Sequence, residues 1–577
     1  MKKNVQLTFA VLLLFVFAAT AQTKWYNPFD NEGDVIQNRA WSDEIGKNYS
    51  RLPDRAKDIV RVPVWNLSRN SAGLAIHFHT NAENIEIRYS VTAPFSMHHM
   101  PSTGVSGVDL YAIDSDGKER RTTNTYSFGD TITFQFKDLI ANSYHKKGFE
   151  YRLFLPLYNS VKWLEVGVPE GAEFRFIERL PEKPIVVYGT SIAHGACASR
   201  PGMAWTNILS RNLDWPVVNL GFSGNGPLDY EMIDLISEID ASIYLLDGLP
   251  NMGKLSSEEV TKRTVYGITK LREKSNTPII IAEHIGYSND KMNVNSFENV
   301  ERLNKASRVA YDSLVSMGVS GIYYMDKAMQ NVPNDGYVDY IHPNDLGMTV
   351  ISNEYERNIR EILNMPKGNM LTTIPVSQSR ELMYYSWKDR FYDIVKGVKT
   401  EQPKKVIIGN SIVHYWGGTQ EHNNGSISWN KVMKPEGFFN MGFGWDRIEN
   451  VLWRVYHGML DGYNADEIVL MIGTNNLGIN SDDEIVEGLR NLSEVIKSRQ
   501  PKATIKMMGL LPRRGQEQRI KELNKKIEGM STSNNLEYSD VGSHLLTKTG
   551  EINEEMFSDG LHPNEKGYSR IVKYIAK

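Results

Sequence analysis

The chain has 577 residues, of which 41% are hydrophobic, so it is long enough to bury several ordinary cores. The 65 lysines and arginines nearly balance the 69 aspartates and glutamates, and no polybasic run occurs. This balance gives no electrostatic reason to expect nucleic acid or a membrane surface as a partner.

The amino terminus has the pattern of a secretory signal peptide. Two lysines precede a short apolar segment, and Ala19-Thr20-Ala21 follow it as a small-residue cleavage site. The apolar segment is far shorter than the ~20 residues that a membrane-spanning helix needs. We therefore expect residues 1–21 to be removed, and the mature chain to be a soluble periplasmic or extracellular protein without a membrane anchor. The single cysteine, Cys197, excludes an internal disulfide.

Short alternating segments occupy the next part of the chain. Runs such as GLAIHFHT and DTITFQFKDL alternate apolar and polar residues with a period of two, and turn residues separate them. Few helical patterns occur between these runs. We therefore predict a β-sandwich domain over residues 22–178.

From Lys183 onward, apolar strand patterns alternate with helical patterns, which is typical of a doubly wound parallel sheet. The first five strand candidates are KPIVVYGT, WPVVNLG, ASIYLLDG, TPIIIAEH and GIYYMD, and the next five are KKVIIGN, GFFNMGFG, DEIVLMIG, ATIKMMGL and LEYSDV. Ser256 and Glu259 have the spacing of a capping box at the start of one helix. The pattern predicts two tandem α/β domains, residues 179–366 and 380–577.

The two α/β segments repeat one set of polar residues at one spacing. Ser191 lies in VVYGTSIAHG and Ser411 in VIIGNSIVHY, each directly after a strand pattern. Each serine precedes an aspartate of a D-x-x-H pair by 148 residues, and both pairs are followed by proline. A single G-x-S turn or a single histidine is weak evidence, but the doubled set is hard to explain by core packing.

The repeated residue types are those of an acyl-transfer triad. A serine hydroxyl needs a histidine to accept its proton, and a carboxylate holds the imidazole tautomer and stabilises the imidazolium. The predicted triads are Ser191, Asp339 and His342 in the first domain and Ser411, Asp559 and His562 in the second. An oxyanion also needs fixed donors at strand ends. Candidates for these donors are Gly224 and Asn251 in the first domain, and Gly444, its neighbour Trp445 and Asn475 in the second.

These motifs resemble the SGNH or GDSL-type esterases in both α/β domains. The resemblance implies a flavodoxin-like sheet order and oxyanion donors from the serine N–H, the second-block N–H and the asparagine side chain. GVDLY, from Gly107 to Tyr111, is similar to the GxDLY domain that precedes such esterases. GFGWDRIENVLWRVYHGML is similar to the catalytic subunit of platelet-activating-factor acetylhydrolase. Thr190 and Asn410 stand where the family has the aspartate of its GDS triplet.

Several aromatic residues are candidates for substrate contacts. Trp416 and Trp445 lie in the motifs that surround the second serine, where each either stacks on a sugar ring or belongs to the core. For Trp453, which lies in a helical pattern, the pattern favours a core position. His98 and His99 either reach the first serine from the sandwich or lie in a surface loop. No H-E-x-x-H or paired-cysteine motif occurs, so we expect neither a catalytic metal nor a cofactor.

The family and the export signal together imply a secreted serine esterase that deacetylates a carbohydrate, an acetylated glycan being the expected partner. Two alternatives remain open from the sequence. One is a lysophospholipase or thioesterase that uses the same triads. The other is a glycan-binding protein in which one of the two sites is incompetent.

Overall fold

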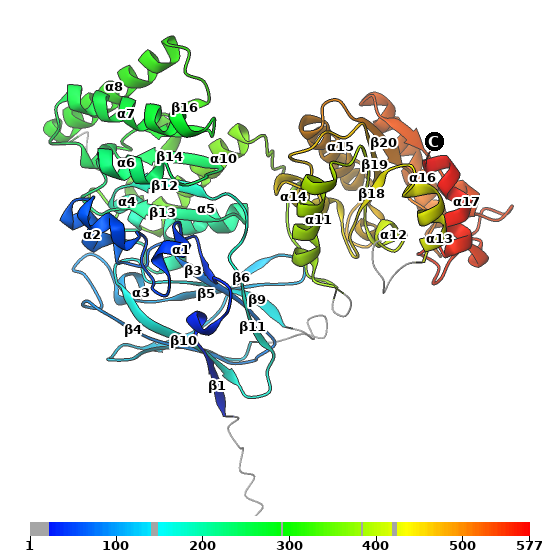
Figure 1. Cartoon of the computed structure of the whole chain (residues 1–577), viewed down its shortest axis with the longest axis horizontal. Helices are drawn as coiled ribbons and strands as arrows, with labels where there is room; N and C mark the ends of the chain where they lie inside the picture. Colours follow the sequence, from blue (N-terminus) through cyan, green and yellow to red (C-terminus); the bar gives the residue numbers. More distant parts are fainter. Residues whose placement is uncertain (1–21, 140–147, 290–291, 382–384, 418–423, 577) are drawn as a thin grey trace, which may run out of the picture.

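The computed structural model describes residues 22–139, 148–289, 292–381, 385–417 and 424–576. The predicted signal peptide, residues 1–21, lies outside these ranges. Figure 1 shows the strand-rich amino-terminal part below the first α/β unit, with the second α/β unit beside them. The order of a strand-rich domain followed by two α/β domains is the one that the sequence predicts. Within the described ranges, no helix is both long and apolar enough to cross a membrane.

The amino-terminal domain consists of two antiparallel sheets with the strand orders β1-β10-β4-β8-β7 and β11-β3-β9-β5-β6, and β2 pairs with β3. Alternate residues of both sheets, such as Phe78, Ile87 and Leu153, are fully buried in one shared apolar core. The period-two pattern of the sequence is therefore the pattern of core-facing residues. The elements are β1 (Thr23–Tyr26), β2 (Ile36–Gln37), α1 (Ser42–Ile45), α2 (Val62–Ser68), β3 (Ala75–Thr80), β4 (Ile85–Val91), α3 (Ser102–Val105), β5 (Asp109–Ile113), β6 (Glu119–Arg121), β7 (Thr125–Ser127), β8 (Ile132–Phe136), β9 (Phe149–Phe154), β10 (Val161–Pro169) and β11 (Phe174–Ile177).

The first α/β domain contains a parallel sheet with the strand order β13-β12-β14-β15-β16. The side chain of Ser256 accepts a hydrogen bond from Glu259 N–H and caps the longest helix before β15, at the position that the sequence predicts. The elements are β12 (Ile185–Gly189), α4 (Ser191–His194), α5 (Trp205–Leu213), β13 (Val217–Gly221), α6 (Tyr230–Ile236), β14 (Ile243–Asp247), α7 (Ser257–Lys274), β15 (Ile279–Ala282), α8 (Val294–Ser316), β16 (Ile322–Met325), α9 (Lys327–Gln330) and α10 (Asp345–Ile362).

The second α/β domain repeats this topology with the strand order β18-β17-β19-β20-β21. Both sheets therefore have the flavodoxin-like order 2-1-3-4-5, in which the first strand of the domain lies between the second and the third. The elements are α11 (Trp387–Glu401), β17 (Lys405–Gly409), α12 (Ser411–His414), α13 (Ser426–Ser428), β18 (Phe438–Gly442), α14 (Ile448–Tyr456), β19 (Glu467–Met471), α15 (Asp482–Arg499), β20 (Thr504–Met508), α16 (Glu517–Ser533), β21 (Glu537–Ser539) and α17 (Glu565–Ile575).

In each α/β domain, the first strand separates two apolar cores. Val186 and Tyr188 of β12 pack into the core on one face of the sheet, whereas Ile185 and Val187 pack into the core on the other face. Successive side chains of a strand point to opposite faces, so a strand covered by helices on both sides must be apolar throughout. This requirement explains the continuous apolar runs that precede both serines.

An arginine from outside each sheet covers the end of its edge strand. The guanidinium of Arg51, in the amino-terminal domain, donates to the carbonyls of Asn219 and Gly221 at 3.2 and 2.7 Å. In the second domain, Arg390 Nε donates to the carbonyl of Gly442 at 2.9 Å. Burial lowers the pKa of Arg51 to about 9 and that of Arg390 to about 10. These carbonyls belong to edge strands whose groups would otherwise lack partners.

A buried ion pair fixes the loop that follows β18. The Asp446 carboxylate accepts hydrogen bonds from Arg454 Nε at 2.9 Å, Trp387 Nε1 at 2.7 Å and Gln378 Nε2 at 3.0 Å. Both charged side chains are completely shielded from solvent. Burial raises the pKa of Asp446, and the positive charge of Arg454 opposes that rise.

We predict that Arg454→Met lowers the stability of the second α/β domain by about 3–5 kcal/mol, because it leaves a buried carboxylate without its counter-ion. The change is measured in a urea titration in which limited proteolysis reports the unfolded fraction of that domain. The control is Arg490→Met on α15, whose ion pairs with Glu487 and Glu494 are solvent-exposed and contribute about 0–1 kcal/mol. Equal effects of the two substitutions would contradict this account.

Candidate functional site

Each candidate nucleophile is the first residue of a short helix at the carboxyl end of the central strand. Ser191 begins α4 directly after β12, and the Thr190 hydroxyl accepts a hydrogen bond from Ile192 N–H at 3.3 Å. Ser411 begins α12 in the same way, with Asn410 Oδ1 accepting from Ile412 N–H at 2.9 Å. The two residues that replace the aspartate of the GDS triplet thus act as helix caps.

The structure brings both predicted triads together. Ser191 Oγ lies 3.0 Å from His342 Nε2, and His342 Nδ1 lies 2.8 Å from Asp339 Oδ2. In the second domain the corresponding distances are 2.8 Å from Ser411 Oγ to His562 Nε2 and 2.7 Å from His562 Nδ1 to Asp559 Oδ2. Each chain of contacts permits a proton to pass from the serine hydroxyl to an imidazole that a carboxylate orients.

Both aspartates are held in the ionised form by their own loops. Asp339 Oδ1 accepts the backbone N–H groups of Ile341 and His342 at 2.7 and 2.6 Å, and Asp559 Oδ1 accepts the equivalent pair in the second domain. Partial burial raises the pKa of each aspartate, but these hydrogen bonds and the one from the histidine ring outweigh burial, so that both pKa values lie below the ordinary value. The ionised carboxylate fixes the proton on Nδ1 and leaves Nε2 to accept from the serine.

The turn after the second strand offers one backbone N–H in each domain. Gly224 has φ of +68° and Trp445 has φ of +65°, so the two residues occupy equivalent positions with the same left-handed backbone. Of the two candidates in the second domain, Gly444 has its N–H engaged already, because it donates to His414 Nδ1 at 3.1 Å. The structure favours Trp445 over Gly444 as the equivalent of Gly224.

The two predicted asparagines follow the third strand and contact the same turn. Asn251 Oδ1 accepts from Gly226 N–H at 2.9 Å, which leaves its amide nitrogen for another acceptor. Asn475 Nδ2 donates one hydrogen to the Asp446 carbonyl at 3.0 Å and has a second hydrogen to offer. Because the carboxyl ends of adjacent parallel strands share one edge of the sheet, both asparagines lie on the serine side of their domain.

The structure places the two candidate tryptophans of the second domain differently. Trp416 is completely buried, where its ring stacks on Tyr568 and its Nε1 donates to Ser428 Oγ at 3.0 Å, so it cannot stack on a ligand. It belongs instead to the apolar core that also contains Tyr568 and Trp429. The Trp445 side chain is 47% exposed. Trp453 is buried, and its Nε1 donates to Asp214 of the first domain at 3.0 Å.

Sequence reasoning missed two tyrosines, each of which packs against the histidine three residues after a serine. The Tyr158 ring, from the amino-terminal domain, stacks on His194 with the ring centroids 4.1 Å apart, and its hydroxyl donates to the Ser191 carbonyl at 3.4 Å. Tyr385, which precedes α11, packs edge-on against His414, and its hydroxyl donates to the Gly444 carbonyl at 2.9 Å. The sequence pattern S-I-x-H, which both domains share, could have singled out His194 and His414, the partners of these tyrosines.

A hairpin of the amino-terminal domain reaches the first triad. The His99 ring lies 5.6 Å from the His342 ring, measured between centroids, and the exposed His98 ring lies beside His99 at 4.3 Å. In the second domain the corresponding neighbour of the triad is Tyr415, whose ring lies 4.9 Å from that of His562. An imidazole therefore borders the first serine centre where a phenol borders the second.

Known proteins match all three parts of the chain. Residues 182–360 and 407–570 each match a family model described as the GDSL-like lipase/acylhydrolase family, and residues 23–174 match the model of the amino terminus of SGNH-hydrolase-type esterases. The platelet-activating factor acetylhydrolase IB subunit alpha2 of Rattus norvegicus is 28% identical over 192 residues, which cover 32% of this chain and 80% of the relative. The alpha1 subunit of Bos taurus is 24% identical over 194 residues, which cover 33% of this chain and 80% of the relative.

One solved structure resembles more than half of the chain. A crystal structure described as a GDSL-like lipase from Bacteroides ovatus ATCC 8483 is 32% identical, with a TM-score of 0.54. The match covers 59% of this chain and 98% of that protein.

We predict that Trp416→Ala lowers the stability of the second α/β domain by about 3–5 kcal/mol, because it removes a fully buried indole and leaves a cavity. Trp445→Ala, at an exposed position, should change stability by no more than about 0.5 kcal/mol. Urea unfolding of both variants makes the comparison. A stable Trp416→Ala variant would show that the indole is not a core residue.

Proposed function

We propose, because the chain belongs to the GDSL-like lipase/acylhydrolase family, that it is an exported esterase whose two Ser-His-Asp centres remove acetyl groups from a carbohydrate. The observation that carries this proposal is the doubled triad, with each serine hydroxyl within 3.0 Å of a histidine that an aspartate orients. Two complete sets of groups support two independent hydrolytic centres rather than one active domain and one inert domain.

In the proposed mechanism, His342 Nε2 takes the proton of Ser191 while Ser191 Oγ forms a bond to the ester carbonyl carbon. The resulting oxyanion is held by the N–H groups of Ser191 and Gly224 and by the Asn251 amide. The C–O bond of the ester then breaks, and the leaving alcohol takes the proton from His342. Water repeats the sequence on the acyl-serine and releases the carboxylic acid.

The second centre uses the same steps with Ser411, Asp559 and His562. Its oxyanion donors are the N–H groups of Ser411 and Trp445 and the Asn475 amide. The backbone N–H of a tryptophan donates a hydrogen bond as well as that of a glycine. The exposed indole is therefore the side chain of the same residue whose backbone N–H holds the oxyanion.

The acetyl group and the carbohydrate rest on separate arguments. Acetyl is supported by the curated relatives, whose names describe acetylhydrolases. Carbohydrate is supported by the predicted export signal and by the exposed Trp445 indole, since a rigid aromatic face packs well on a sugar ring. The names of the relatives also favour a second candidate, an acetylated phospholipid, which the experiments below include.

We predict that Ser191→Ala and Ser411→Ala each remove only part of the ester hydrolysis, and that the double variant falls to background. The oxyanion donors that remain in the double variant supply only a small residual acceleration without a nucleophile. Acetate release should be measured on a panel of acetylated glycans, on 4-nitrophenyl acetate and on an acetylated phospholipid.

Circular dichroism of each variant controls for folding, since a serine-to-alanine change at a helix start should leave the domain intact. Loss of all hydrolysis in Ser411→Ala alone would show that the first domain is not an independent esterase. Cleavage of the phospholipid without release of acetate from any glycan would replace the carbohydrate by the phospholipid.

We predict that Trp445→Gly raises the KM of the second centre for an acetylated glycan at least about fivefold and leaves kcat/KM for 4-nitrophenyl acetate nearly unchanged. Glycine adopts the φ of +65° without strain and keeps the backbone N–H, so only the indole is lost. The measurement uses the Ser191→Ala background, in which the second centre acts alone. A parallel loss on both substrates would mean that the indole maintains the oxyanion turn rather than binding the sugar.

A further inference from the structure

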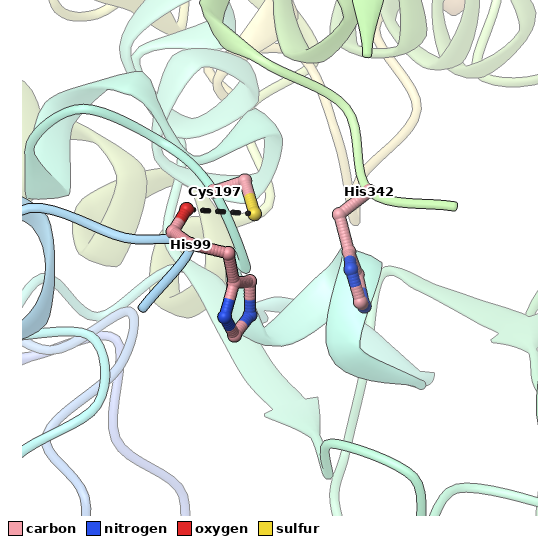
Figure 2. A group of neighbouring side chains, drawn as sticks. All are labelled: His99, Cys197 and His342. Atoms are coloured by element: carbon pink, nitrogen blue, oxygen red, sulfur yellow. Dashed lines mark hydrogen bonds between the residues drawn. The ribbon is translucent and has the colours of Figure 1, made fainter. Parts of the chain in front are cut away.

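A cluster of metal-ligating side chains adjoins the first triad. The ligand atoms of His99, Cys197 and His342 all lie within 4.8 Å of one another. Figure 2 shows the Cys197 sulfur and the His99 ring together, with the His342 ring facing them across a short gap. The three residues come from the amino-terminal domain, the loop after α4 and the D-x-x-H loop, so they meet only in the folded chain.

The backbone holds this cluster in place. Met97 and Met100 exchange two backbone hydrogen bonds, which close the hairpin that carries His99. Met100 is buried in one apolar cluster with Ala198, the residue after Cys197. The Cys197 thiol also donates to the His99 carbonyl at 3.4 Å. The sulfur and the His99 ring are therefore fixed relative to each other before any ligand arrives.

The His99 ring has an unused nitrogen in this cluster. His99 Nδ1 is buried and has no hydrogen-bond partner among the described residues. His342 Nδ1 contacts Asp339 Oδ2 at 2.8 Å and His342 Nε2 lies 3.0 Å from Ser191 Oγ, so a metal bound to Nε2 would replace the contact with the serine. A carboxylate behind a histidine is the usual support for a metal-bound imidazole.

The donor set of the cluster, one sulfur and two imidazoles, suits a thiophilic cation. Thiolate and imidazole ligands together suit Zn²⁺. Zinc bonds of about 2.0–2.3 Å place neighbouring ligand atoms roughly 3.5 Å apart, which small side-chain rotations would achieve here.

We propose that the first centre, but not the second, binds Zn²⁺ or a similar thiophilic divalent cation through Cys197, His99 and His342, and that the bound cation switches this centre off. Binding releases the thiol proton to solvent and forms a metal–sulfur bond, with water as the fourth ligand. The His342 Nε2 lone pair then binds the metal, so it no longer accepts the Ser191 proton. The second triad has no cysteine beside it, since the chain contains one cysteine.

Metal binding itself is tested without any reliance on activity. Co²⁺ added to the full chain should give a thiolate-to-cobalt charge-transfer band in the near ultraviolet with one ion bound per chain. Cys197→Ser should abolish the band, and His99→Gln should weaken Co²⁺ binding at least tenfold. Absence of the band in the unmodified chain, or its persistence in Cys197→Ser, would overturn the proposal.

The inhibition, which rests on the proposed function, is tested in the two single-centre variants. Zn²⁺ should inhibit hydrolysis by Ser411→Ala at least tenfold, with full recovery in EDTA, and should leave Ser191→Ala unaffected. Adding Cys197→Ser to Ser411→Ala should keep hydrolysis and remove the sensitivity to zinc. Equal inhibition of both single-centre variants would contradict a site specific to the first centre. If Ser411→Ala hydrolyses no ester, the function proposed for the first centre fails, and the cobalt band alone decides the metal site.

Discussion

Both centres depend on the close approach of the serine helix to the neighbouring strand. A Cβ atom on Gly221 would lie 2.3 Å from the backbone nitrogen of His194, and one on Gly442 would lie 2.2 Å from that of His414. Only glycine permits this contact, which lets the chain turn sharply from the central strand into α4 or α12. The serine then projects at the carboxyl edge of the sheet, where the asparagine turn and the D-x-x-H loop also arrive. This contact therefore positions each serine within hydrogen-bonding distance of its histidine.

Each centre is completed by residues from outside its parallel sheet. In the first domain, Arg51 and Tyr158 of the amino-terminal domain cover the edge strand and pack against the histidine after the serine. In the second domain, Arg390 and Tyr385, from the segment just before the sheet, occupy the equivalent places. An arginine and a tyrosine thus complete each centre, but they come from the amino-terminal domain in the first case and from the segment before β17 in the second. The sandwich is therefore part of the structure around the first serine, and its hairpin also supplies the His99 imidazole.

The sequence was sufficient for the features that repeat. The serine, aspartate and histidine positions recur at one spacing, and the strand patterns are apolar because both faces of each sheet are covered. The aromatic residues were harder, because a tryptophan next to a motif has the same local pattern whether it faces solvent or core. Trp416, which follows α12, faces inward and stacks on Tyr568 of α17, more than a hundred residues away in the sequence. Tyr158 and Tyr385 were beyond reach because each packs against a histidine that is not its neighbour in the sequence, Tyr158 across a domain boundary and Tyr385 within the second domain. His99 was a candidate from the sequence, and the structure places its ring 5.6 Å from that of His342.

The central claim is that one chain carries two independently activated serines. Intact-mass analysis after saturation with a fluorophosphonate probe tests this claim directly, because such probes react with a serine only when a histidine activates it. The account predicts a mass increase of two probe groups, with peptide mapping that assigns one to Ser191 and one to Ser411. A single adduct at saturation, on either serine, would contradict it.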